Sequence, residues 1–116
     1  MKVNEVRFNN WVNFKWAGVH YGDVMIDANY FSHYDKKDYI YSPIPLTEQW
    51  LIDFGCIKDG NTWDIPDDNK YLTLEMDEVT NAWEYIKDEH YLNTTYYVHQ
   101  LQNLHFALTG KELIKK

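Results

Sequence analysis

YLTLEMD, residues 71–77, alternates apolar and polar side chains and decides the fold class. Leu72, Leu74 and Met76 fall on one face of an extended chain, and the remaining residues fall on the other. A period of two is typical of a β-strand with one face against a core. The segment Ala82 to Lys87 follows after a short connection and places Trp83 and Tyr85 on one face, which predicts a neighbouring strand.

The same pattern continues upstream of this pair. Asp59-Gly60 is a favoured two-residue turn and predicts a hairpin between residues 56–58 and 61–63. Further strands are expected at Trp11 to Trp16, Val19 to Asp27 and Asp38 to Ser42, with Ala17-Gly18 as the turn between the first two.

Two segments have helical character instead. Thr47 can cap a short helix over residues 48–54, and Gly55 stands where a helix commonly ends in a left-handed conformation. Tyr97 to Leu108 is the clearest helix, with Thr95 as its possible cap and Gly110 as its stop. Its apolar stripe consists of Val98, Leu101, Leu104 and Leu108.

These elements predict one α+β domain over residues 1–116. It contains six or seven mainly antiparallel strands, a short middle helix and a C-terminal helix. The length of 116 residues suits a single domain, and 45% hydrophobic residues supply a core. We expect no membrane-spanning segment, no secretory signal and a cytoplasmic location, which the single cysteine also suits.

The acidic residues are concentrated in one stretch. The chain has a formal net charge of −7, and residues 64–90 carry nine acids against two lysines, so the remainder is neutral. This charge argues against a basic groove for nucleic acid and favours a basic protein as partner. A solvated face that keeps the domain soluble is the alternative.

No set of residues has the spacing of a catalytic or metal site. The five histidines lack zinc-ligand spacing, and Pro66 with a missing glycine breaks the calcium-loop pattern that begins at Asp64. Cys56 follows a helix rather than opening one, which predicts a structural thiol. The sequence therefore predicts a protein that is not an enzyme and that uses no cofactor and no metal.

Aromatic residues are abundant. The chain has 5 Trp, 10 Tyr and 5 Phe, more than a domain of this size can bury completely. Tyrosine and tryptophan are enriched at binding hot spots, so part of this set is expected to contact a partner. The alternative is that the rings cover both faces of a thin sheet.

Three segments resemble one group of proteins. PIPLTEQWL (residues 43–51), ending at Phe54-Gly55, and YVHQLQNL (97–104), followed by FALTG (106–110), are similar to motifs of small uncharacterised proteins of Bacteroidota phages, prophages and mobile elements. RFNNWV (residues 7–12) resembles their N-terminal strand. The resemblance leaves out residues 64–91 and implies phage or prophage accessory cargo expressed inside a bacterium.

That setting favours an anti-CRISPR or other anti-defence inhibitor. CRISPR effectors are strongly basic because they hold RNA and DNA in positive channels, so an acidic surface can dock on them. The expected partner is a basic CRISPR-type nuclease effector of the host, bound stoichiometrically by a monomer or dimer. The expected contact residues are Asp67, Asp68, Tyr71, Glu75, Asp77, Glu78, Trp83, Glu84 and Tyr85.

Two alternatives remain open. A self-associating phage structural or assembly protein would use the tyrosine-rich segment between Tyr21 and Tyr41, and a small regulator of phage replication would bind a different enzyme in the same way.

Overall fold

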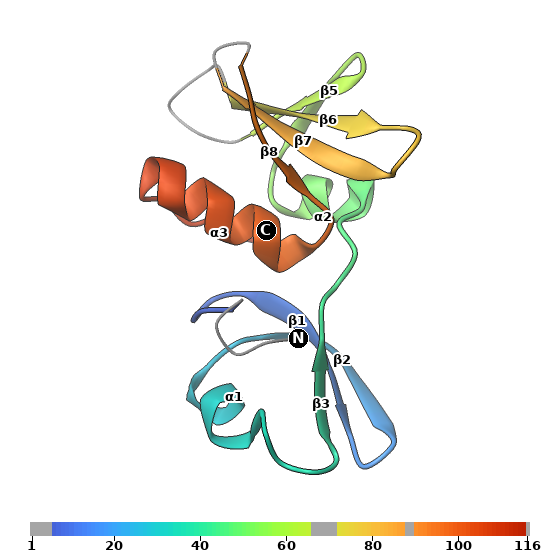
Figure 1. The fold of residues 1–116 in the computed structure, drawn as a ribbon, viewed down its shortest axis with the longest axis vertical. Helices are drawn as coiled ribbons and strands as arrows, with labels where there is room; N and C mark the ends of the chain where they lie inside the picture. Colours follow the sequence, from blue (N-terminus) through green and yellow to red (C-terminus); the bar gives the residue numbers. More distant parts are fainter. Residues whose placement is uncertain (1–5, 66–71, 88–89, 116) are drawn as a thin grey trace.

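Two antiparallel sheets with a helix between them make up the fold (Figure 1). The computed structural model describes residues 6–65, 72–87 and 90–115. One sheet has three strands in the order β2-β1-β3, and the other has five in the order β4-β5-β6-β7-β8. The predicted α+β class with antiparallel strands is confirmed. The predicted number of elements is too small, since these residues contain eight strands and three helices.

The three-stranded sheet comprises β1 (Trp11–Trp16), β2 (Val19–Met25) and β3 (Tyr39–Ser42). The predicted turn at Ala17-Gly18 is confirmed, and both residues have positive φ, 50° and 83°. Such a turn matches the twist of the strands that it joins. The helix α1 (Ala28–His33), which the sequence analysis missed, covers part of this sheet. It is held by the buried side chain of Tyr30, which packs in a small core with Val12 and Ile26.

The five-stranded sheet comprises β4 (Ile57–Asp59), β5 (Thr62–Asp64), β6 (Leu72–Asp77), β7 (Ala82–Lys87) and β8 (His90–Thr95). The hairpin between β4 and β5 is confirmed, but Asp59 pairs with Thr62, so its turn is Gly60-Asn61, one residue later than predicted.

The alternation in β6 is confirmed for Leu72 and Leu74, which are buried, but not for Met76, which is 37% exposed. Met76 pairs with Trp83 near the end of the strand, where it lines an open cavity instead of the core.

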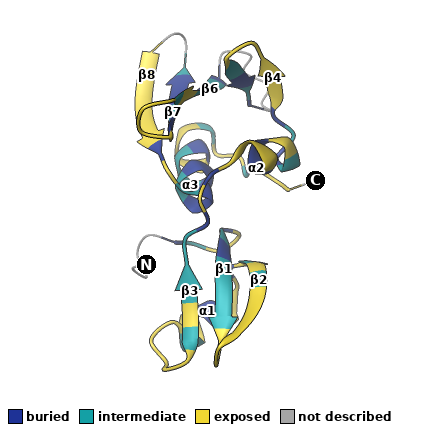
Figure 2. Ribbon diagram, turned by 90° about the vertical axis from the view of Figure 1, so that its right-hand side faces the viewer, coloured by how far each residue is buried: buried dark blue, intermediate teal, exposed yellow. Residues whose placement is uncertain are grey.

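The helices α2 (Glu48–Asp53) and α3 (Val98–Thr109) cover the inner face of the five-stranded sheet. Figure 2 shows the buried residues gathered where these helices meet it. As predicted, the Thr47 hydroxyl accepts a hydrogen bond from the Trp50 N–H, and Gly55 has a φ of 84°. The main core contains Ile44, Leu46, Trp50, Leu51, Phe54, Cys56, Trp63, Ile65, Leu72, Leu74, Trp83, Tyr85, Val98, Leu101 and Leu113.

The start of α3 differs from the prediction. Its cap is Tyr97, whose backbone N–H donates to Gln100 Oε1. The predicted cap, Thr95, lies at the end of β8, and its hydroxyl donates to the Trp83 carbonyl at 3.2 Å. The stop at Gly110 is confirmed, with φ at 73°. Leu108, the last residue of the predicted stripe, is 40% exposed and is not part of the core.

One buried side chain joins α3 to the three-stranded sheet. Gln102 accepts a hydrogen bond from the Trp11 N–H through Oε1 and donates one to the Asn9 carbonyl through Nε2, both at 2.9 Å. Beside it, Asn10 Nδ2 donates to Asn103 Oδ1 at 2.8 Å. These contacts hold β1 against the side of α3 that faces away from the larger sheet (Figure 1).

Cys56 is buried at the entrance to β4, as expected of a structural thiol. Burial first, and the nearby Asp64 carboxylate second, raise the pKa of this thiol to about 12. We expect thiol-specific alkylation at about pH 8 to be slow in the folded protein and fast in concentrated guanidinium chloride. Unfolded thiols ionise near pH 8.5, so the thiol's contribution to stability is complete below that pH and is lost as pH rises towards 12. Alkylation of the folded protein at the rate of a free thiol would contradict this.

Candidate protein-binding surface

Two of the predicted contact residues lie side by side on the outer face of the five-stranded sheet. Glu75 in β6 pairs directly with Glu84 in β7, and the same row continues to Thr62 in β5 and Thr94 in β8. The alternation that sends Leu74 inward sends Glu75 outward, away from α2 and α3. Directly opposed side chains on one face have their Cβ atoms about 5 Å apart, so the two carboxylates repel each other.

Tyr91 adds an aromatic ring to this acidic face. From β8, its hydroxyl donates to Glu75 Oε2 at 3.4 Å, so the side chain crosses β7 on the outer face. The pKa of the Tyr91 hydroxyl is raised above its usual value. The main cause is the Glu75 carboxylate, followed by slight burial and by the Glu84 carboxylate. The sequence analysis missed Tyr91 because β8 shows no alternation, with the first five of its six residues exposed.

Among the described residues, no cation forms an ion pair with the carboxylates of Glu75 and Glu84. Over the residues that the structure describes, the ion pairs are Arg7–Glu112 and Lys58–Glu48, and neither involves these two glutamates. Like charges directly opposite each other destabilise a sheet, so this arrangement lowers the stability of the fold. Departures from favourable pairing are expected at functional sites. We call Glu75, Glu84 and Tyr91 the acidic face.

The other predicted carboxylates on described residues lie at the end of β6. Asp77 Oδ1 accepts a hydrogen bond from the Val79 N–H at 2.9 Å and thereby shapes the loop between β6 and β7. Glu78 is exposed in that loop. Asp67, Asp68 and Tyr71 lie outside the described residues.

Trp83 and Tyr85 are not surface residues, and their prediction as contacts is wrong. Their side chains are 1% and 0% exposed. Trp83 Nε1 donates to the Leu46 carbonyl at 3.1 Å, and the Tyr85 hydroxyl lies 3.0 Å from His105 Nδ1 in α3. The physical reason is the pleat of the strand, because residues that flank Glu84 must point to the opposite face.

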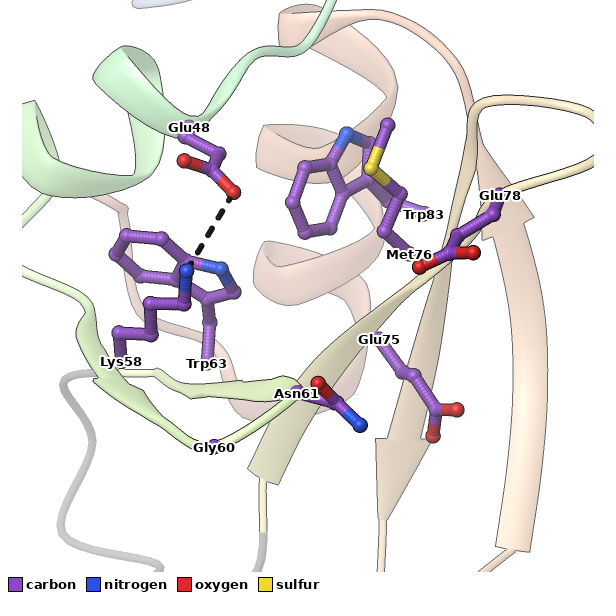
Figure 3. Close-up of a pocket in the computed structure, with 9 residues that line it drawn as sticks. All are labelled: Glu48, Lys58, Gly60, Asn61, Trp63, Glu75, Met76, Glu78 and Trp83. Atoms are coloured by element: carbon purple, nitrogen blue, oxygen red, sulfur yellow. Dashed lines mark ion pairs between the residues drawn. The ribbon is translucent and has the colours of Figure 1, made fainter.

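A cavity of about 300 Å³ opens at the end of the sheet, next to the acidic face (Figure 3). The indoles of Trp63 and Trp83 form its walls, with Met76 beside Trp83 and Glu48 of α2 above them. Lys58 Nζ lies 3.9 Å from Glu48 Oε1 and 5.8 Å from the centre of the Trp63 ring. Glu75 and Glu78 complete the rim.

A second surface feature lies on the three-stranded sheet. Phe14 stacks on Tyr21, Tyr39 and Tyr41, with ring centres 5.4, 6.2 and 4.7 Å away, and Trp16 extends the group. Trp16 and Tyr21 are exposed. We call these five residues the aromatic face. It confirms that several rings remain at the surface.

Across residues 6–65, 72–87 and 90–115, no group of three or more histidine, cysteine or carboxylate side chains is placed to hold a metal ion. None of the helices in these ranges has the length and apolar character needed to cross a membrane. No family model matches the chain, and neither a curated protein nor a solved structure does.

Proposed function

We propose that this protein is a non-enzymatic inhibitor that binds a basic, nucleic-acid-handling protein through the acidic face. The observation that carries the proposal is the opposed pair of Glu75 and Glu84, which lowers stability and which no described cation neutralises. A basic partner would relieve this repulsion on binding.

The chemistry of the face suits a partner that holds nucleic acid. Lysine and arginine side chains that normally contact phosphates can pair equally well with carboxylates. Tyr91 offers a rigid ring whose hydroxyl already lies near Glu75, so a partner can contact apolar and charged groups together. An inhibitor that occupies the nucleic-acid channel of its partner blocks the loading of nucleic acid without any chemical step.

The resemblance of residues 43–55 and 97–110 to phage and prophage proteins suggests the class of target. A phage accessory protein expressed in a bacterium meets CRISPR and restriction effectors, which are basic because they bind RNA or DNA. We therefore propose an anti-CRISPR-like role in the host cytoplasm. The alternative function that would use the same surface is regulation of a phage replication enzyme.

An affinity capture tests this proposal. The tagged protein is incubated with lysate of a bacterium that carries active CRISPR and restriction systems, and captured proteins are identified by mass spectrometry. We expect a basic nucleic-acid-handling effector that is released at about 0.5 M salt, where exposed charges are screened beyond a few ångströms. Purified effector and its nucleic acid then show whether loading is blocked.

Charge reversal locates the interface. The double variant Glu75→Lys, Glu84→Lys should lose the captured effector. The matched control, Asp23→Lys with Asp35→Lys, changes the net charge equally at exposed positions away from the five-stranded sheet and should retain it. Equal capture by both double variants would rule out the acidic face as the docking surface.

The single variant Glu84→Lys separates binding from folding. It turns a repulsive cross-strand pair into an attractive one, so the free energy of unfolding should rise by roughly 0.5–1 kcal/mol while capture weakens. Urea unfolding followed by tryptophan fluorescence measures the first effect. A loss of stability in this variant would mean that Glu84 supports the fold and is not held there for binding.

The aromatic face favours a second candidate function, self-association as an assembly protein. Exposed Trp16 and Tyr21 provide apolar area for a second copy. Size-exclusion chromatography with light scattering should show oligomers of the purified protein if this is correct, and Tyr21→Ser should dissolve them. A monomer at high concentration contradicts this second candidate.

A further inference from the structure

We propose that residues 111–115 form a C-terminal strap that controls the docking of the three-stranded sheet on the rest of the molecule. This inference goes beyond the proposed function, because it concerns the relative movement of two parts of the fold and does not depend on the acidic face. Three observations support it: the separation of two cores, the contacts of the strap with both parts, and two buried donors at the seam between them.

Among the described residues, the fold has two hydrophobic cores that share no side chain. The small core holds the three-stranded sheet against α1, and the main core lies between the five-stranded sheet and the helices α2 and α3. Residues 43–47 connect β3 to α2, and Figure 1 shows the three-stranded sheet at one end of the molecule, with α3 between the two sheets. Each part can therefore keep its own core while their relative position changes.

The seam between the two parts is rich in polar contacts. Gln102 of α3 bonds to the backbone of Asn9 and Trp11, and Asn103 bonds to Asn10 beside it. Trp11 of β1 also packs on the main core. Polar interfaces within one chain resemble transient protein interfaces, so relative movement is expected unless further contacts restrain it.

The strap is anchored on the side of the main core. It begins after Gly110, whose φ of 73° ends α3, and it forms no helix or strand, so its position depends on its side chains. Leu113 is 4% exposed and packs in the main core. Figure 2 shows the chain ending beside α2. One end of each strap contact is therefore fixed to the larger part of the molecule.

Two charged side chains of the strap reach across the seam. The Glu112 carboxylate forms an ion pair with Arg7, just before β1, and its Oε2 lies 3.1 Å from Arg7 Nη2. Lys115 Nζ lies 4.7 Å from the ring centres of both Trp11 in β1 and Trp50 in α2. These two ring centres are 5.7 Å apart, so the ammonium joins one ring from each part of the molecule.

The contacts across the seam are weak enough to open. Lys115 is exposed, and the Arg7 and Glu112 side chains are 28% and 25% exposed. Cation–π contacts and ion pairs near the surface each contribute little. A cavity of about 240 Å³ separates the strap from the three-stranded sheet, so dispersion contacts are missing there. It is lined by Asn9, Met25, Glu112, Leu113 and Ile114.

Two donors at the seam favour its opening. Within residues 6–65, 72–87 and 90–115, neither Arg7 Nε nor Trp11 Nε1 has a hydrogen-bond partner, although both are buried. A buried donor without an acceptor costs free energy that contact with water recovers. Both donors belong to side chains that the strap contacts. The strap therefore opposes an opening that these two groups favour.

Hydrogen exchange of indole N–H groups, followed by NMR in the whole chain, tests the inference. Trp11 reports on the seam, and Trp83, whose Nε1 bonds to the Leu46 carbonyl, reports on the main core. The double variant Glu112→Ala, Lys115→Ala removes both contacts across the seam and keeps the anchor in the main core. We expect the exchange of Trp11 to accelerate about tenfold while that of Trp83 does not change.

A matched control and a change of salt sharpen the test. Asp35→Ala with Lys37→Ala removes the same two charges at exposed positions in the loop between α1 and β3, and should leave both exchange rates unchanged. At about 1 M salt, charges are screened beyond about 3 Å. This salt concentration should accelerate the exchange of Trp11 in the unmodified protein, and clearly less in the variant that lacks Glu112 and Lys115.

Equal acceleration at Trp11 and Trp83 would overturn the inference, because the strap would then stabilise the fold as a single unit. An unchanged Trp11 signal in the Glu112→Ala, Lys115→Ala variant, or the same salt response with and without these two side chains, would overturn it as well. Acceleration at Trp11 alone, absent from the control, supports the strap. None of these results depends on capture of a partner, so the proposed function is tested separately.

Discussion

Replacing Gln102 by leucine should lower the free energy of unfolding by about 3 kcal/mol, because two backbone groups lose their partner in the interior. The Trp11 N–H and the Asn9 carbonyl both bond to the Gln102 side chain, which is completely buried. Leucine is similar in size but offers no polar atom. Each buried group left unpaired costs about 1–3 kcal/mol, so the loss is large relative to the stability of a small domain.

Urea unfolding followed by tryptophan fluorescence measures this change. Gln49→Leu is the matched control, since Gln49 is an exposed residue of α2 that bonds only to Asp53 in the described structure, and it should change stability by less than about 0.5 kcal/mol. Equal effects of the two glutamine variants would show that Gln102 does not hold β1 against α3.

Replacing Trp83 by alanine should cost about 3–5 kcal/mol, the range for a large aromatic side chain removed from a core. The indole is 1% exposed and packs in the main core, and its Nε1 satisfies the Leu46 carbonyl just before α2. The variant therefore removes apolar contacts and a buried hydrogen bond together.

Trp83→Phe separates the two contributions. It keeps an aromatic ring but leaves the Leu46 carbonyl without its donor, so its cost should be clearly smaller than that of alanine. Thermal unfolding by circular dichroism gives both values. A fully stable Trp83→Ala variant that had lost partner capture would contradict the structural role and return Trp83 to the contact surface.

The local pattern of the sequence predicts most of the strands and the helices α2 and α3. Alternation places Leu72, Leu74, Trp83 and Tyr85 correctly on inner faces, because burial on one side of a sheet selects apolar residues at every second position. Turn and cap residues such as Gly18 and Gly110 act through backbone conformation, which is a local property.

Local sequence patterns do not predict elements that are held by contacts with distant residues. The helix α1 is as short as α2 but ends at Tyr34, without the glycine that follows α2, and it depends on Tyr30 packing with Val12. β8 is an edge strand in which the first five of six residues are exposed. Burial therefore does not select apolar residues at every second position, and its sequence shows no alternation. The packing of β1 against α3 depends on Gln102, whose side-chain partners Asn9 and Trp11 lie more than ninety residues away.

The sequence predicts the negative charge of the candidate site but not the full set of residues that form it. The acidic stretch includes Glu75, Glu84 and Glu78, whose role as contacts stays a prediction. Strict alternation excludes Trp83 and Tyr85 from the face that carries Glu84. Because neighbouring residues of a strand point to opposite faces, Trp83 and Tyr85 cannot share the exposed face with Glu84. Tyr91, and Glu48 with Lys58, join the surface through strand pairing and helix placement, which no local pattern reveals.

The link between Trp11 and Gln102 also sets the order of events on the ribosome. The two residues are 91 positions apart, so at about 5–20 residues per second the strand β1 emerges several seconds before the helix that it docks against. During that interval the nascent three-stranded sheet has its Trp11 side uncovered and open to chaperones.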